Sequence, residues 1–171
     1  LTSLLGLYKN KSLRLVRYSS QGIRPVPAKY LNGVEAQSAF SDQFPYLITS
    51  WESLEKLNTG LIKNGSQVAE MDRFRPNIVV KGIDNLEKKT SQNLLCQKSG
   101  YDFGLRKPCK RCKIITINQD DGTIINPKEP LATLTSLRFS DEIKGAFFGQ
   151  NAILLSNKSY ILKVGDELSI S

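Results

Sequence analysis

Residues 46–58 read YLITSWESLEKLN, and this stretch joins a strand pattern directly to a helix pattern. The apolar run at 46–49 is typical of a buried strand. Ser50 then stands where a helix N-cap is expected, and leucines spaced by three follow it. The Asn-Thr-Gly sequence at 58–60 predicts that the helix stops there. We therefore expect a strand that leads straight into a short helix.

Outward from this stretch, most of the chain predicts short strands. Strand patterns occur at 12–19, 77–82, 113–118, 147–155, 160–164 and 167–170, with 123–125 as a returning hairpin arm. Residues 131–139 predict a second helix, and residues 1–7 resemble the last turn of another. The two prolines within 22–27 predict a loop. The expected fold class is mostly β with a few short helices, arranged as a closed or nearly closed β-barrel.

Composition narrows the possible functions. The chain has 171 residues, which suits one domain, and 40% hydrophobic residues suffice for a core. Lys and Arg number 24 against 16 Asp and Glu, and the net charge of +8 favours an anionic partner. The absence of histidine excludes Ser-His-Asp and Cys-His catalysis and every histidine-ligated metal. No apolar run approaches the roughly 18 residues of a membrane span.

The cysteines point to a reducing compartment. Cys96, Cys109 and Cys112 are three in number, which suits no disulfide framework, and a domain of this size needs none. The cytoplasm is therefore the expected location.

The densest functional signal is residues 106–113, RKPCKRCK, in which two thiols lie among five cations. Cations beside a thiol favour its thiolate, which is both a nucleophile and a soft metal ligand. Four interpretations remain open at this point. The pair could belong to a zinc site, although only Cys96 is left as a further ligand, or to a dithiol redox centre. It could also be two buried cysteines at a strand start, or a soft-metal or sulfur-handling site beside an anionic cofactor.

Three weaker signals accompany it. In residues 72–77, DRFRPN, the position before proline is expected to be extended, so that Arg75 and Asn77 project to the same side. A guanidinium beside a carboxamide suits a phosphate or a heterocycle, but an exposed Arg and a turn-forming Asn explain the pattern equally well. Residues 40–45 (FSDQFP) and 148–151 (FGQN) are each compatible with simple turns.

Taken together and in order, these segments resemble the MOSC domain, a family named for the C-terminal region of molybdenum cofactor sulfurase. The resemblance runs from about Leu13 to the end of the chain. It is carried by residues 42–57 (DQFPYLITSWESLEKL), 74–80 (FRPNIVV), 108–116 (PCKRCKIIT), 121–122 (DG), 127–133 (PKEPLAT), 148–151 (FGQN) and 164–166 (VGD). The branch that looks most similar holds the mitochondrial amidoxime reducing component and its bacterial counterparts.

The resemblance implies a MOSC-type β-barrel with a bound molybdenum cofactor, which is a phosphorylated pterin dithiolene (molybdopterin). It implies reduction of N-hydroxylated compounds such as N-hydroxylated bases and amidoximes, in a reaction independent of pyridoxal phosphate. Cys112 takes the position of the molybdenum ligand and Asp42 that of an active-site aspartate, whereas Cys109 is a buried neighbour. The positions matched to cofactor contacts are Gln43, Phe44, Arg75, Asn77, Lys110, Arg111 and Asn151.

The resemblance also shapes what is expected around the domain. Residues 1–171 are expected to form a single MOSC domain cut from a longer protein, without the N-terminal β-barrel extension of this branch and its Lys-Ser cofactor contact. Residues 1–171 contain no ferredoxin-type cysteine set. Electrons are therefore expected from a separate protein or from a removed iron–sulfur domain. Residues 86–93 correspond to an acidic stretch of the family but lack its tryptophan, so residues 90–100 are expected to differ in their substrate contacts.

Two alternatives remain beside the oxidoreductase. In the first, the chain is a sulfur-transfer or molybdenum cofactor carrier domain in which Cys112 bears a persulfide or delivers the cofactor. In the second, it is a non-enzymatic basic barrel that binds nucleic acid. Against the second, aromatic residues do not interleave with the basic cluster as a stacking platform requires.

Overall fold

A six-stranded sheet organises the chain in a computed structural model that describes residues 7–8, 11–12, 15–19, 21–138, 144–156 and 161–171. The strand order is β4-β3-β7-β6-β5-β8, in which β3 and β4 are parallel and every other neighbouring pair is antiparallel. The strands are β3 (Tyr46–Ser50), β4 (Ile78–Val80), β5 (Asn93–Cys96), β6 (Tyr101–Lys110), β7 (Phe147–Leu154) and β8 (Ser169–Ile170).

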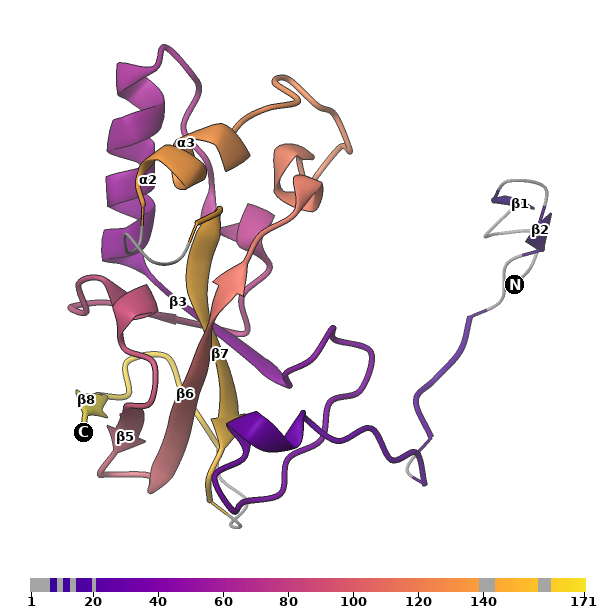
Figure 1. The fold of residues 1–171 in the computed structure, drawn as a ribbon, viewed down its shortest axis with the longest axis vertical. Coiled ribbons are helices and arrows are strands. Elements are labelled where there is room, and N and C mark those ends of the chain that lie inside the picture. The colour runs from indigo at the N-terminus through magenta and orange to yellow at the C-terminus, as the bar shows by residue number, and fades with distance from the viewer. Residues whose placement is uncertain (1–6, 9–10, 13–14, 20, 139–143, 157–160) are drawn as a thin grey trace.

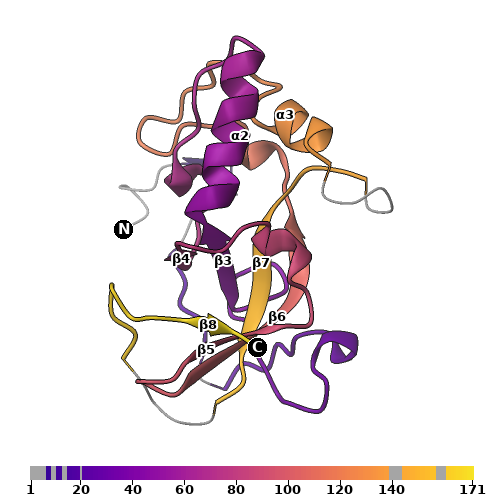
Figure 2. The same ribbon diagram turned by 90° about the vertical axis from the view of Figure 1, so that its left-hand side faces the viewer.

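The sheet curls into a half-barrel whose two edges are β4 and β8 (Figure 2). Apolar side chains fill its inner face, because alternate residues of each strand point there. This inner cluster includes Ile48, Leu94, Phe103, Leu105 and Ala152, which are at most 3% exposed. The prediction of a mostly β fold with a few short helices is confirmed.

Helical elements gather at one end of the sheet (Figure 1). They are the helices α2 (Trp51–Lys63) and α3 (Leu131–Ser136) and the 3₁₀ turns η2 (Met71–Phe74) and η4 (Lys113–Thr116). A second apolar cluster joins them to β7, and within it the rings of Phe74 and Phe148 stack with centroids 3.7 Å apart. A further 3₁₀ turn, η3 (Leu86–Lys88), contributes Leu86 to the inner cluster. Among the described residues, no helix is long and apolar enough to cross a membrane.

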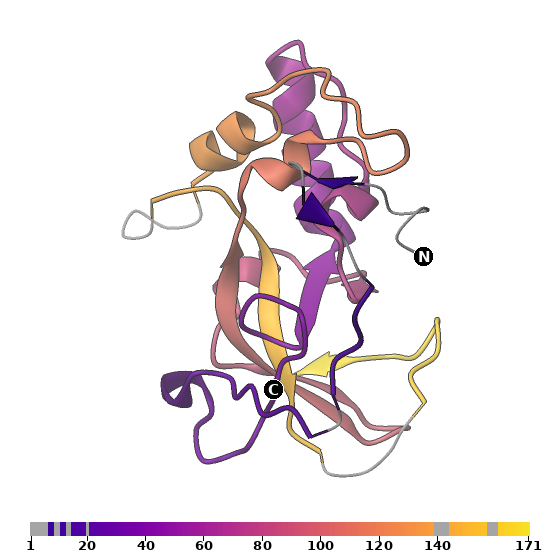
Figure 3. The ribbon, with the colours of Figure 1, turned by 90° about the vertical axis from the view of Figure 1, so that its right-hand side faces the viewer.

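The outer face of β6 and β7 is partly covered by the N-terminal segment (Figure 3). A 3₁₀ turn, η1 (Ala28–Tyr30), belongs to this segment, and Val26 and Phe44 bury themselves against Ile153 of β7. Further toward the N-terminus, β1 (Leu7–Tyr8) pairs with β2 (Lys11–Ser12) away from the main sheet. The segment thus leaves the part of the outer face nearer the helical end free for a site.

Several local predictions are confirmed. Strands occupy all of 46–49 and most of 147–155, and shorter strands lie within 77–82 and 167–170. Ser50 caps α2, since its Oγ accepts a hydrogen bond of 3.2 Å from the backbone N–H of Ser53. Helix α3 begins directly after Pro130, as the proline at its start predicted.

The predicted end of α2 at 58–60 is wrong, because the helix continues to Lys63. Packing explains the continuation: a Cβ at Gly60 would lie 2.8 Å from Thr133 Cγ2, so only glycine allows α3 to approach this closely. Asn58 does not stop the helix either. Its carboxamide bonds both backbone groups of Ala69, at 2.8 and 3.0 Å, and so holds the chain that follows the helix.

The strand predicted at 113–118 is also wrong. Its β-branched residues form η4, which buries Ile115 in the helical cluster rather than in the sheet. Residues 123–125 form no returning strand; Ile124 and Ile125 are exposed, and Thr123 only closes a turn by accepting a bond from the Asn118 N–H. The apolar pattern at 113–118 correctly indicated a buried residue, but that residue packs among helices and not in the sheet. Periodicity alone does not distinguish these two environments for a short apolar run.

The remaining differences lie at the two ends and in the centre. Residues 15–19 and 161–164 are not strands, and Leu15 and Ile161 are more than 70% exposed. The helical turn predicted at 1–7 falls largely outside the described residues, apart from Leu7 in β1. The sequence patterns did not predict β5 or β6. Because β6 ends at Lys110 and 113–118 is not a strand, the Cys-x-x-Cys pair lies at the end of a strand and not just before the start of one.

Candidate functional site

A bulge in β6 turns the end of this strand toward the outer face of the sheet. Leu105 pairs with Ala152 of β7, but Lys107 pairs with Asn151, so Arg106 is the extra residue. An extra residue moves every following side chain to the opposite face. Leu105 therefore points into the half-barrel, whereas Lys107 shares the outer face with Asn151.

Arg111 fixes the chain just beyond β6. Its Nη1 donates to the Cys109 sulfur at 3.0 Å, and its Nη2 donates to the carbonyl of Phe74 at 2.9 Å. Its backbone N–H bonds the carbonyl of Ala146 at 2.8 Å. This side chain thus ties the Cys-x-x-Cys segment to the Phe-Arg-Pro-Asn segment, which the sequence predicted to share a site.

The three cysteines have different environments. Cys96 is fully buried in the inner cluster, Cys109 is half-buried beside the Arg111 guanidinium, and Cys112 is exposed at the start of η4. Only Cys112 therefore presents a thiol that a ligand can reach freely. A structural zinc site finds no support in the described part of the chain, where no group of three or more Cys, Asp or Glu could hold a metal.

Arg75 and Asn77 lie beside this segment, but their backbone differs from the prediction. Arg75 is not extended; its φ of 52° and ψ of 50° place it in the left-handed region directly after η2. The Asn77 Oδ1 accepts a bond from the Leu47 N–H at 2.8 Å, and the Asn77 N–H bonds the Leu47 carbonyl at 2.9 Å. Asn77 therefore aligns β4 with β3, while its side-chain amide N–H groups remain available.

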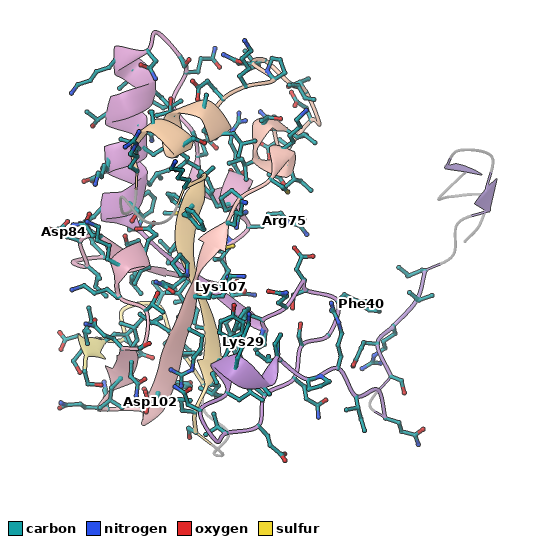
Figure 4. The ribbon with its side chains drawn as sticks, in the orientation of Figure 1. Lys29, Phe40, Arg75, Asp84, Asp102 and Lys107 are labelled. Carbon is teal, nitrogen blue, oxygen red and sulfur yellow. The ribbon has the colours of Figure 1, made fainter. Side chains whose placement is uncertain are left out.

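Asn151 continues this row across the sheet. It is half-buried in β7 and stands in register with Leu47 on one side and Lys107 on the other. Residues in register on neighbouring strands share a face, so Asn151 and Lys107 are neighbours on the outer face. The row from Asn77 through Asn151 to Lys107 therefore runs beside the end of β6 (Figure 4 labels Arg75 and Lys107).

The loop with Asp42 is organised by a residue that the sequence patterns did not identify. Arg24 donates from Nη2 to the Asp42 carbonyl at 2.6 Å and from Nη1 to the carbonyls of Ala39 and Ser41. The Asp42 carboxylate is exposed and accepts no hydrogen bond from the described residues. A cation that binds several carbonyls of one loop was not recognisable in sequence, because these contacts span 15 to 18 positions.

Two of the predicted contact residues flank Asp42 but point differently. Gln43 is exposed, whereas the Phe44 ring is 5% exposed and packs against Tyr30 with centroids 5.2 Å apart. Phe44 therefore anchors the loop in the apolar cluster that it forms with Val26 and Ile153. Its assignment as a cofactor contact stays a prediction.

A buried carboxylate behind the Phe-Gly-Gln-Asn segment was also missed. Glu87 is 3% exposed, and its two oxygens accept bonds from the Gly149 N–H at 2.9 Å and the Ser53 hydroxyl at 2.8 Å. Gln150 in turn donates to the Glu87 carbonyl at 2.6 Å. These bonds hold β7 against η3 and α2, which fixes the strand that presents Asn151.

The residues at this outer face suit an anionic group with a soft metal centre. The Nε of Arg111 is buried and has no hydrogen-bond partner among the described residues, so one donor of the guanidinium is unused there. Arg75 and Lys110 are exposed and form no ion pair with a described residue. The cationic donors suit the phosphate of the cofactor that the resemblance implies, and the reachable thiol of Cys112 suits its metal as a thiolate ligand.

Fold and site together define a small half-barrel domain with a thiol and several free cations on its outer face. The chain belongs to the MOSC domain family, whose model matches residues 35–169. Mitochondrial amidoxime-reducing component 1 of Mus musculus is 33% identical over 168 residues, covering 92% of this chain and 46% of that protein.

Two further relatives agree with this assignment. Mitochondrial amidoxime reducing component 2 of Homo sapiens is 35% identical over 135 residues, covering 78% of this chain and 38% of that protein. Molybdenum cofactor sulfurase of Oryza sativa subsp. japonica is 32% identical over 123 residues, covering 68% of this chain and 14% of that protein. The chain thus spans less than half the length of these relatives.

Proposed function

We propose that this domain holds the molybdenum cofactor through the thiolate of Cys112 and takes part in the reduction of N-hydroxylated compounds such as amidoximes and N-hydroxylated bases. The observation that carries the proposal is the reachable Cys112 thiol beside the Arg111 clamp, in a chain related to amidoxime-reducing components. When bound, the cofactor supplies a metal that passes two electrons to the N–O bond.

The chain's own residues would bind and orient this group. Arg75, Lys110 and Arg111 would supply the counter-charge for its phosphate, and a planar guanidinium such as that of Arg111 binds phosphate oxygens especially well. The free amide donors of Asn77 and Asn151 would meet acceptors on the heterocycle. Arg111 also sets the position of Cys112 by binding both Phe74 and Cys109 on either side of the site.

Asp42 and Gln43 would act on the substrate side. Conversion of N–OH to N–H consumes two electrons and two protons and releases water, so a group that delivers protons is needed. The Asp42 carboxylate is exposed to solvent and is free to pass a proton inward. Arg24 would be the positioning residue for this step, because it holds the carbonyls of the loop and not the reacting atoms.

The electron source belongs to the proposal as well. A separate donor protein, or an iron–sulfur domain outside this chain, would deliver electrons to the site. We propose the cytoplasm as its location, on the basis of three unpaired cysteines. The relatives are named as mitochondrial proteins, and localisation of a tagged full-length protein would decide between the two compartments.

The test compares cysteine variants in a reductase assay with benzamidoxime and a chemical electron donor. Cys112→Ala is expected to lower kcat at least about a thousandfold, because the metal loses its protein ligand. Cys96→Ala is the matched control, since its sulfur lies in the inner cluster away from the site. Full activity of a folded Cys112→Ala protein would refute the proposal.

The sulfur-transfer hypothesis remains as a second candidate because an exposed thiol and a relationship to molybdenum cofactor sulfurase also support it. In that case Cys112 would carry a terminal sulfur atom and release it to an acceptor. A mass spectrum that shows a reductant-labile extra sulfur on Cys112, in a protein without reductase activity, would favour this function over the first.

A further inference from the structure

Two lysines from distant parts of the chain share one aromatic ring on the outer face. The Nζ of Lys29 lies 5.0 Å from the centroid of the Tyr30 ring, and the Nζ of Lys107 lies 5.7 Å from the same centroid. Lys29 and Tyr30 belong to η1, whereas Lys107 belongs to β6. Figure 4 shows Lys29 and Lys107 following each other along this side of the sheet, below Arg75.

These two charges are not neutralised within the described structure. Neither ammonium group donates a hydrogen bond to a described residue or forms an ion pair with one. The two ammonium groups are separated by at most the sum of their distances to the ring, which is somewhat more than the screening length of about 8 Å in physiological salt. Contact with a ring face leaves the hydrogen-bond donors of each ammonium group unused.

The lysine pair is continuous with the candidate site. Lys107 stands in register with Asn151 and precedes Cys109 by two positions on the same strand. The bulge at Arg106 is what brings Lys107 to this face, and Tyr30 packs against Phe44 at the end of the Asp42 loop. A group bound by the two lysines would therefore lie between the Asp42 loop and Asn151.

We propose that Lys29, Lys107 and the ring of Tyr30 form a subsite for an anionic group, a carboxylate or phosphate, on the N-hydroxylated substrate. This inference rests on the proposed function and adds a substrate class to it. Arg75, Lys110 and Arg111 can serve the cofactor's phosphate. Lys107 precedes Cys109 by two positions on β6, and Lys29 reaches the same ring from η1, so the lysine pair is free to select a charged substrate.

Matched substrates test this selectivity. Benzamidoxime and 4-carboxybenzamidoxime differ by one carboxylate, and the informative quantity is the ratio of their KM values. In Lys29→Ala/Lys107→Ala the KM for the carboxylate, relative to that for benzamidoxime, is expected to rise about ten- to a hundredfold, because two charge-assisted contacts are lost. Lys29→Arg/Lys107→Arg keeps the charge and should retain most of the preference.

Lys98→Ala serves as the control, since Lys98 is an exposed lysine in the turn between β5 and β6. Lys98→Ala removes one positive charge, as each of the two substitutions in the double variant does, and should leave the KM ratio unchanged. An unchanged ratio in the double alanine variant would overturn the proposal. So would an equal loss for both substrates together with loss of bound molybdenum, because the lysines would then hold the cofactor's phosphate.

A binding measurement separates this inference from the proposed function. By calorimetry, the purified protein should bind 4-carboxybenzamidoxime about tenfold more tightly than benzamidoxime, and the double alanine variant should lose the difference. If the protein reduces neither compound but keeps this lysine-dependent preference, the subsite stands and the reductase function fails. Equal affinities of the wild-type protein for the two compounds would overturn the subsite.

Discussion

At the scale of single residues, several positions of the sequence motifs have structural roles. Gly149 in the Phe-Gly-Gln-Asn segment has a φ of 77°, and a Cβ there would lie 2.6 Å from the Ile48 carbonyl. Its N–H binds Glu87, and Gln150 binds the backbone of Glu87. The segment thus first fixes β7, and only Asn151 faces the site.

Gly149→Ala is therefore expected to lower the free energy of unfolding by about 3 kcal/mol or more, because strain at positive φ adds to a backbone clash. Chemical denaturation followed by circular dichroism measures this loss. Gly65→Ala is the matched control: its φ of 68° is similar, but a Cβ meets nothing within 4 Å. A loss at Gly149 no larger than the roughly 1 kcal/mol expected at Gly65 would refute the role of the clash.

The residues that sequence could not predict make long-range contacts. Cys112, Arg75 and Asn77 were predicted as site residues because their motifs resemble those of a family. Arg24 and Glu87 were not, since their roles depend on carbonyl and amide groups brought near by folding. Nothing in the sequence around Arg24 and Glu87 distinguishes them from other charged residues.

At the scale of elements, the strands with one regular face were predicted and the others were not. β7 carries apolar residues at both of its ends, at 147–148 and 152–154, whereas β6 changes faces at its bulge and so shows no single alternation. The strand predicted at 113–118 was wrong for a different reason: its pattern is that of a strand, but Ile115 packs in the helical cluster. The expected fold class survived these errors because the core sheet keeps β3, β4 and β7.

Helix α2 is joined to the turn after β4 through Glu52, which accepts a bond from the Gly82 N–H at 2.6 Å. Burial acts to raise the pKa of Glu52, but the Gly82 N–H and the nearby charge of Lys81 outweigh it and leave this pKa below its usual value of 4.5. The ionised form is therefore favoured in the folded state. Its stabilisation is fully present above about pH 4.5 and is lost as the pH falls through the lowered pKa.

Glu52→Gln should accordingly lower the free energy of unfolding at pH 7 by about 1 kcal/mol, with a smaller difference from the wild-type protein near pH 3. Denaturant titrations across this pH range would measure it. Glu55→Gln, on an exposed face of the same helix, should change little at either pH. A deficit of Glu52→Gln that grows on acidification would contradict the account.

At the scale of the whole molecule, the half-barrel keeps its main apolar core apart from the candidate site. Its inner face is filled with apolar side chains, whereas its outer face carries Lys107, Asn151 and the Asp42 loop beside a small apolar cluster around Phe44. The helical end supports the site through Phe74, whose carbonyl receives Arg111. Variants on the outer face should therefore change binding before they change the fold.

The central claim is that Cys112 and its neighbouring cations hold the molybdenum cofactor. The most direct measurement is the molybdenum content per polypeptide of the protein purified from a host that makes the cofactor, compared among wild type, Cys112→Ser and Cys96→Ser. The account predicts molybdenum in wild type and Cys96→Ser, and a loss of about tenfold or more in Cys112→Ser with unchanged circular dichroism. Equal molybdenum in wild type and a folded Cys112→Ser protein, or none in the wild type, would contradict it.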